Sequence, residues 1–169
     1  MRKLKYEIKW AFIFIGALLL WMLGEKIAGL HDQRIDQHAF YSSFFAVVAV
    51  GLYILAMADK RKNYYRGFMT WQEGFVFGLW MTGVIVLLTP LAQLIINSLI
   101  TPDYFTNMRE YSVETGQLSA EDAVSTFNLK RYIFESMVFA GIMGVITAAI
   151  AALIMRKRRP DPTQVKGTV

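Results

Sequence analysis

The sequence predicts an all-α membrane protein, built as a bundle of four transmembrane helices with both termini on the cytoplasmic side. Three observations predict this fold class. Of the 169 residues 55% are hydrophobic, the apolar residues form long uncharged blocks, and Lys and Arg flank these blocks. Such blocks are longer than a soluble core requires. The formal net charge of +5 therefore does not indicate a nucleic-acid partner, because the basic residues are not gathered on a folded surface.

Four blocks are long enough to cross a bilayer, since a hydrocarbon core of ~30 Å needs about 20 helical residues. The expected spans are residues 10–30, 39–58, 73–100 and 131–155. Glu25 and Lys26 interrupt the first span. A cleaved signal peptide is the alternative for this block, but bulky Trp21 and Met22 stand where a cleavage site needs small residues. Pro90 is expected to kink the third span.

The distribution of basic residues predicts the orientation. Of the 18 Lys and Arg, 13 lie before the first span, between the second and third, or after the fourth. The positive-inside rule places these segments in the cytoplasm and the other two loops outside, as in a bacterial inner-membrane protein. Residues 1–158 then form a single membrane domain. Residues 159–169, which follow a basic run, are expected to be a disordered cytoplasmic tail.

Local sequence signals predict where several helices begin. Thr70 and Glu73 have the spacing of a capping box at the start of the third span. Ser119 is expected to start a short helical turn, and Asn128 to cap the fourth span.

The outer loop, residues 101–130, is expected to carry a short amphipathic helix. Thr101 followed by Pro102 suggests an N-cap and a first helical residue, and Gly116 can end the helix. One face of this helix is aromatic and apolar: Tyr104, Phe105, Met108 and Tyr111. The helix can lie on the membrane surface or roof the bundle.

Small residues recur along the third and fourth spans. Membrane helices associate by close packing at such residues, because lipid offers no hydrophobic reward for association. The predicted packing residues are Gly74, Gly78, Ala140, Gly144, Ala148 and Ala152. They can pack the four spans against one another or form the interface of a dimer.

Polar residues gather at the outer ends of the spans and form a candidate outer polar site. Its expected members are Glu25, His31, His38, Gln93, Asn97 and Glu135. Such a set could bind a cation, relay a proton or hold a polar lipid headgroup. The structural alternative pairs Glu25 with Lys26 and Glu135 with Arg131, and has Gln93 and Asn97 hydrogen-bond a neighbouring helix.

The sequence contains none of the motifs that mark hydrolases, metalloproteases or nucleotide-binding proteins. The chain has no Cys, which excludes thiolate ligands and cysteine nucleophiles. Two histidines seven residues apart are a weak metal signal. The sequence therefore predicts a protein that is not an enzyme, with no cofactor and no assigned metal.

Several short stretches, read in order, resemble a family of small four-span inner-membrane proteins of Bacteroidetes known as domain of unknown function 4199. The stretches are Ile8 to Trp10, Glu25 with Gly29 to Asp32, Gly67 to Phe75, Thr101 to Phe105, Phe127 to Leu129 with Tyr132, and Arg156-Lys157. The resemblance covers roughly residues 5–158. It implies the architecture and an inner-membrane location, and it transfers no catalytic residue.

Two functional hypotheses follow. The first is a non-enzymatic accessory or scaffold protein that packs against a membrane-protein partner or against itself as a homo-oligomer, surrounded by membrane lipid. The second is a small oligomeric transporter, or a lipid- or ion-binding membrane protein, that uses the outer polar site. The second ranks lower because alternating access needs polar residues in both halves of the membrane and usually an internal repeat.

Overall fold

The computed structural model describes residues 4–158 as a chain of helices. The elements in order are α1 (Lys5–Ile27), η1 (Ile35–Gln37), α2 (His38–Ser43), α3 (Phe45–Asn63), α4 (Trp71–Ile95), η2 (Ile96–Ile100), α5 (Tyr104–Glu114), α6 (Ala120–Thr126) and α7 (Leu129–Met155). The tail expected at residues 159–169 lies outside the described residues.

Within the described residues, four helical segments are long and apolar enough to cross a membrane, which confirms the predicted all-α class and the number of spans. They are Lys5–Ile27, Ile35–Asn63, Trp71–Ile100 and Leu129–Met155. The first span is shifted from the prediction, because α1 starts at Lys5 and ends at Ile27 rather than covering 10–30. The chain is thus a multi-pass membrane protein by the length and composition of its helices.

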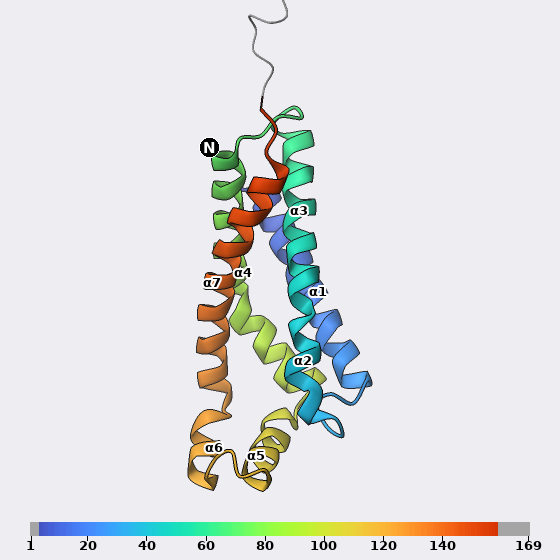
Figure 1. The fold of residues 1–169 in the computed structure, drawn as a ribbon, viewed down its shortest axis with the longest axis vertical. Coiled ribbons are helices and arrows are strands. Elements are labelled where there is room, and N and C mark those ends of the chain that lie inside the picture. Colours follow the sequence, from blue (N-terminus) through green and yellow to red (C-terminus); the bar gives the residue numbers. More distant parts are fainter. Residues whose placement is uncertain (1–3, 159–169) are drawn as a thin grey trace, which may run out of the picture.

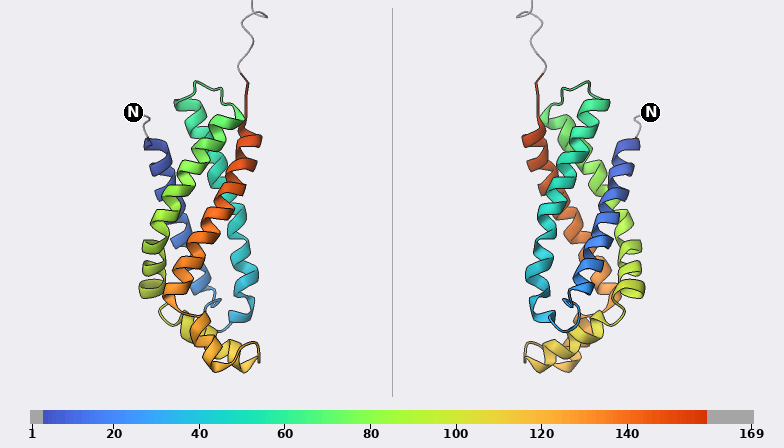
Figure 2. Two further views of the ribbon diagram at one scale, coloured as in Figure 1. Left: turned by 90° about the vertical axis from the view of Figure 1, so that its left-hand side faces the viewer. Right: turned by 90° about the vertical axis from the view of Figure 1, so that its right-hand side faces the viewer.

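The bundle has two distinct ends, here called proximal and distal. The proximal end carries the start of α1, the connection from α3 to α4 and the end of α7, and the distal end carries α2, α5 and α6 (Figure 1). Side views show α4 and α7 running side by side, with α1 and α3 beside them (Figure 2). In Figure 1 the second half of α4 runs obliquely to its first half, as expected for a helix that contains Pro90.

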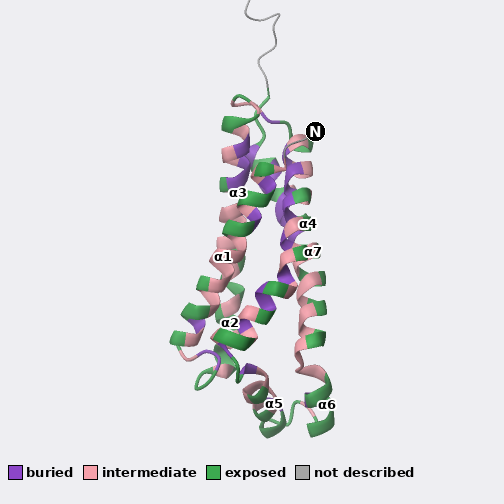
Figure 3. Ribbon diagram, turned by 180° about the vertical axis from the view of Figure 1, so that it is seen from behind, coloured by how far each residue is buried: buried purple, intermediate pink, exposed green. Residues whose placement is uncertain are grey.

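The apolar core lies in the proximal half of the bundle. Its buried members are Ala11, Tyr53, Ala56, Met57, Met69, Phe77, Met81, Ile85, Ala148, Ala151, Ala152 and Met155. Figure 3 shows the buried residues following α4 and the facing sides of its neighbours, whereas the outward faces are exposed and apolar. Lipid is the expected neighbour of those outward faces.

The small residues of α4 and α7 pack against one another inside the bundle. A Cβ added at Gly78 would lie 2.5 Å from the Cβ of Ala148, and one added at Gly74 would lie 3.1 Å from the Cβ of Ala152. A Cβ added at Gly144 would lie 2.4 Å from Cγ2 of Thr82. These residues therefore set the close approach of α4 and α7, while Ala140, nearer the distal end, is only half-buried.

A buried ion pair lies at the proximal end of the bundle. The sequence does not predict it, because its pattern puts Lys60 in a cytoplasmic loop. Lys60 is inside α3 and donates to the carboxylate of Glu7 on α1, with both side chains buried. Its ammonium also lies 4.7 Å from the ring centroid of Phe77. Asp59, one residue earlier, accepts from Lys9 at 2.7 Å and from Trp10 at 2.8 Å. These contacts join α1 to α3.

Most predicted helix starts are confirmed. The capping box of Thr70 and Glu73 begins α4, Ser119 caps α6 and Asn128 caps α7. The predicted cap at Thr101 is wrong, because α5 begins only at Tyr104. The π-helix η2 extends the preceding span to Ile100, and the Thr101 hydroxyl bonds back to the Ile96 carbonyl at 3.5 Å.

Replacing Gly78 with Ala should destabilise the bundle, because the added methyl group would clash with the Cβ of Ala148. The Cβ of Ala148 cannot move away by a side-chain rotation, because it is attached directly to the backbone. Overpacking of this kind costs about 1–3 kcal/mol. Gly83→Ala in the same helix is the matched control, since nothing lies within 4 Å of its Cβ position. Thermal unfolding in detergent should show a lower midpoint for Gly78→Ala and an unchanged or slightly higher one for Gly83→Ala. Equal midpoints would contradict the described α4–α7 contact.

Candidate functional site

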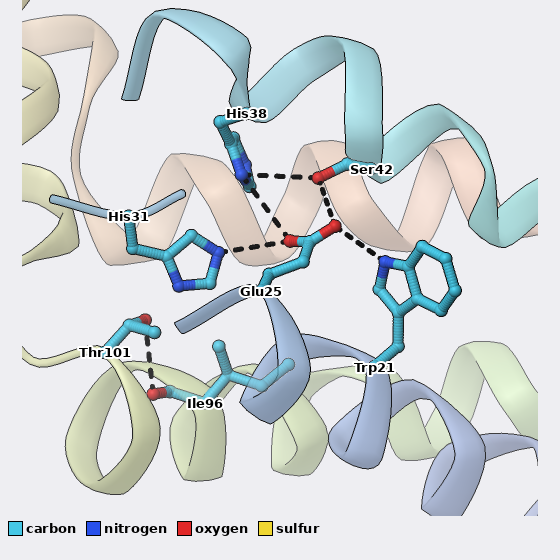
Figure 4. A network of polar contacts seen from close by, with 7 residues as sticks. All are labelled: Trp21, Glu25, His31, His38, Ser42, Ile96 and Thr101. Carbon is cyan, nitrogen blue, oxygen red and sulfur yellow. Dashed lines mark hydrogen bonds and ion pairs between the residues drawn. The ribbon is translucent and has the colours of Figure 1, made fainter. Parts of the chain in front are cut away.

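The carboxylate of Glu25, in the last turn of α1, is buried at the distal end with a relative exposure of 4%. Its Oε1 accepts hydrogen bonds from Nε1 of Trp21 at 2.6 Å and from Oγ of Ser42 at 2.7 Å. Its Oε2 faces Nε2 of His31 at 3.1 Å and Nδ1 of His38 at 3.5 Å (Figure 4). Both oxygens are therefore occupied, as a buried carboxylate requires.

The C-terminal turn of α1 brings His31 back onto Glu25. Gly29 has a φ of 77°, which an L side chain rarely adopts. The amide of Leu30 donates to the carbonyl of Glu25 at 3.0 Å, and the amide of Gly29 donates to the carbonyl of Lys26 at 3.0 Å. These two bonds form a Schellman motif, the common glycine-dependent end of a helix. The next residue of the chain is His31, whose ring is buried against Glu25.

The remaining partners of the Glu25 carboxylate come from two helices. Trp21 precedes Glu25 by one turn of α1, so both side chains lie on one face of the helix. His38 and Ser42 are likewise one turn apart on α2, and Oγ of Ser42 lies 3.3 Å from Nδ1 of His38. We use the name Glu25 cluster for Glu25, His31 and His38, whose potential ligand atoms all lie within 4.8 Å of one another.

Helix α5 covers the Glu25 cluster. The ring centroid of Tyr104 lies 5.5 Å from that of His31 and 5.2 Å from that of His38. Burial raises the pKa of the Tyr104 phenol far above its ordinary value, and the neighbouring Tyr132 adds to the shift. Tyr104 therefore remains a neutral aromatic wall of the site at physiological pH. The predicted alternative of a roof over the bundle is the one observed for this end of α5.

A polar contact holds α5 to the loop that carries His31. Nδ2 of Asn107 donates to the main-chain carbonyl of His31 and to Oδ1 of Asp32, each at 2.9 Å. Asp32 also pairs with Lys26 at 2.7 Å. The loop after α1 is thus fixed between the end of its own helix and α5.

The structure brings three of the six predicted site residues together and separates the other three. Nε2 of Gln93 donates to Oγ of Ser136 at 3.1 Å, and Nδ2 of Asn97 donates to the Gln93 carbonyl at 2.8 Å. The Gln93–Ser136 bond joins α4 to α7, and the Asn97–Gln93 bond lies within one helical segment. Neither bond reaches the Glu25 cluster. The two amides interact at i and i+4, as predicted, and the contact with α7 is made by Gln93.

The placement of Glu135 in the site is wrong. Its side chain is 54% exposed and pairs with Nε of Arg131 at 2.7 Å, so the structural alternative holds for this residue. The corresponding alternative for Glu25 is also wrong, because Lys26 pairs with Asp32 instead. The Glu25 carboxylate has only imidazole, indole and hydroxyl partners among the contacts described for it.

Sequence reasoning missed Trp21, Ser42 and Tyr104 as parts of the site. The signal for Trp21 and for Ser42 was the helical spacing of four residues from Glu25 and from His38. The signal for Tyr104 was its place on the apolar face of the predicted outer helix. None of these spacings predicts that α1, α2 and α5 contact one another in the folded chain.

The arrangement has the chemistry of a small-cation site. A carboxylate oxygen and two imidazole nitrogens converge, and the side chains that hold them are nearly inaccessible to water. The same groups could share protons, since each imidazole nitrogen can donate or accept. Oε2 of Glu25 lies 3.1 Å from Nε2 of His31 and 3.5 Å from Nδ1 of His38, which is too close for an organic molecule to lie between them.

Comparison with known proteins assigns the chain to a family. A family model described as protein of unknown function DUF4199 matches residues 9–157. No curated protein and no solved structure matches the chain.

Replacing Asn107 with Ala should loosen α5 over the Glu25 cluster, because it removes both hydrogen bonds to the His31 loop. Each lost bond costs about 0.5–1.5 kcal/mol. Thr106→Ala is the matched control, since Thr106 is an exposed neighbour on the same helix. Tryptic cleavage after Arg109 in detergent should be faster in Asn107→Ala than in Thr106→Ala. Identical cleavage rates would show that these hydrogen bonds do not hold the roof.

Proposed function

Because the chain belongs to the DUF4199 family, whose description names no activity, we propose a function from its polar site: a non-enzymatic, cation-binding multi-pass membrane protein that uses the Glu25 cluster. The observation that carries the proposal is the convergence of His31 and His38 on one buried oxygen of Glu25. A bound cation would neutralise the charge of this buried carboxylate.

The presence of an ionisable residue, Glu25, within a membrane segment also supports a binding role. An ionisable residue within a membrane segment is costly, and such residues commonly mark ion pathways or ligand sites. A purely structural polar contact at this position could be made by an amide or a hydroxyl group at lower cost. Two titratable imidazoles facing one carboxylate are more than helix packing requires.

The accessory hypothesis receives less support than the cation site. This hypothesis takes the small residues of α4 and α7, together with the outer amphipathic helix, as the surface for a partner or a second copy. Gly74, Gly78 and Gly144 instead face side chains of the same chain at close distance. A variant such as Gly144→Leu would disturb the bundle itself, so it cannot report on assembly with a partner.

The orientation that we propose puts both termini in the cytoplasm and the Glu25 cluster on the outer side of a bacterial inner membrane. The support is the positive-inside rule, because 13 of the 18 Lys and Arg stand in the sequence before the first span, between the second and third spans, or after the fourth span. Lys60 belongs to this count although it is buried against Glu7. In this orientation the cation reaches the site from outside the cell or from the periplasm.

Single cysteines should report the proposed orientation without background, because the chain has no Cys. Gln117→Cys lies between α5 and α6, and Asn63→Cys ends α3, both at exposed positions. A membrane-impermeant maleimide added to cells with a permeabilised outer membrane should label Gln117→Cys, and Asn63→Cys only after lysis of the inner membrane. The reverse pattern would place the Glu25 cluster in the cytoplasm.

A cation should stabilise the wild-type protein through Glu25. We expect at least one ion in a panel of Na⁺, K⁺, Mg²⁺, Ca²⁺, Mn²⁺ and Zn²⁺ to raise the thermal midpoint in lipid nanodiscs. An ion at 100 times its Kd contributes about 2.7 kcal/mol. Glu25→Gln should lose the response, whereas Glu135→Gln, the same change at an exposed carboxylate, should keep it. A panel without effect on the wild type would refute the cation-binding function.

A further inference from the structure

We infer that the Glu25 cluster selects a divalent transition-metal ion, with Zn²⁺ as the best fit, coordinated by Oε2 of Glu25, Nε2 of His31 and Nδ1 of His38. This inference rests on the proposed cation-binding function and names the class of ion. It begins from the donor atoms, which are two nitrogens and one oxygen.

The donor set excludes the hard cations on chemical grounds. Ca²⁺ and Mg²⁺ prefer six or more oxygen ligands, and Mg²⁺ keeps several of its waters. Imidazole nitrogen favours Zn²⁺, Cu²⁺, Ni²⁺ and Fe²⁺. Two histidines and one carboxylate form a known three-ligand zinc set, which leaves a fourth position for water or another small ligand.

The distances between donor atoms fit a small tetrahedral ion. Bonds of about 2.0–2.1 Å put neighbouring ligand atoms of a tetrahedral site about 3.3 Å apart. Oε2 of Glu25 lies 3.1 Å from Nε2 of His31 and 3.5 Å from Nδ1 of His38. The potential ligand atoms of the three side chains all lie within 4.8 Å of one another, and the two distances at the carboxylate already match the spacing of a tetrahedral site.

The outer shell of the cluster orients the carboxylate for this role. Trp21 and Ser42 both donate to Oε1 of Glu25, which leaves Oε2 directed toward the two imidazoles. Partners of this kind fix the orientation of metal-ligating side chains. The bond from Asn107 to the main chain of His31 fixes the loop, and the Tyr104 ring lies beside both imidazoles.

Titration with Co²⁺ as a visible probe of tetrahedral sites tests the inference. The full chain, purified in detergent and freed of metal with a chelator, should bind one Co²⁺ and show an intense d–d band. Zn²⁺ should displace it, and excess Mg²⁺ or Ca²⁺ should not. Glu25→Gln should weaken binding by more than about 100-fold, since even the loss of an outer-shell partner costs about 10–100-fold. Glu135→Gln should bind Co²⁺ as the wild type does.

A second variant keeps the test decisive if Glu25→Gln fails to fold. His38→Gln changes a less buried ligand, with 12% of its side chain exposed, and should fold and lose the tetrahedral spectrum. If Co²⁺ does not bind the wild type but Na⁺, K⁺, Mg²⁺ or Ca²⁺ stabilises it through Glu25, the transition-metal inference is wrong and the cation-binding function stands. If no cation acts through Glu25, both are wrong and the cluster is a proton-sharing structural network.

Discussion

The burial of one carboxylate, that of Glu25, determines the organisation of the distal end of the molecule. A charge in an apolar environment must be surrounded by donors or by a counter-ion, because its desolvation otherwise costs several kcal/mol. Donors from α1, α2 and the loop between them meet this requirement. The α1 helix consequently ends in a glycine-dependent turn that returns the chain, and α5 packs over the result.

The two ends of the bundle are stabilised by different means. The proximal half has a compact core in which glycines and alanines let α4 and α7 approach closely. The distal half has few buried apolar side chains and depends on the Glu25 cluster and on aromatic contacts with Tyr104. An ion bound at the cluster would therefore act where apolar packing contributes least, so its binding would be coupled to the order of the distal end.

Local signals in the sequence predict much of this fold. The spans follow from the hydrophobic blocks. The caps at Thr70 and Ser119 follow from patterns of four residues, and the cap at Asn128 follows from its place before the fourth span. The buried pair of Glu7 and Lys60 could not be found this way, because it joins residues 53 positions apart. In the same way, His31 and Glu25 meet through a turn whose geometry depends on Gly29, and no helical spacing relates them.

The errors at the candidate site have a common physical cause. Gln93, Asn97 and Glu135 were grouped with Glu25 because they were expected at a similar depth in the membrane. Depth does not determine which side of a helix faces which neighbour. Gln93 hydrogen-bonds Ser136 on α7, and Glu135 pairs with Arg131 on the exposed surface of the same helix, α7. The rotation of each helix about its axis depends on packing along its whole length.

Amide hydrogen exchange in nanodiscs, with and without Zn²⁺, tests most directly whether a cation at Glu25 orders the distal end. The account predicts that Zn²⁺ slows exchange in residues 25–43 and 104–114 of the wild type and leaves α7 unchanged. The same segments of Glu25→Gln should exchange faster than in the wild type and should not respond to Zn²⁺. Equal exchange in these segments with and without the ion would contradict the account.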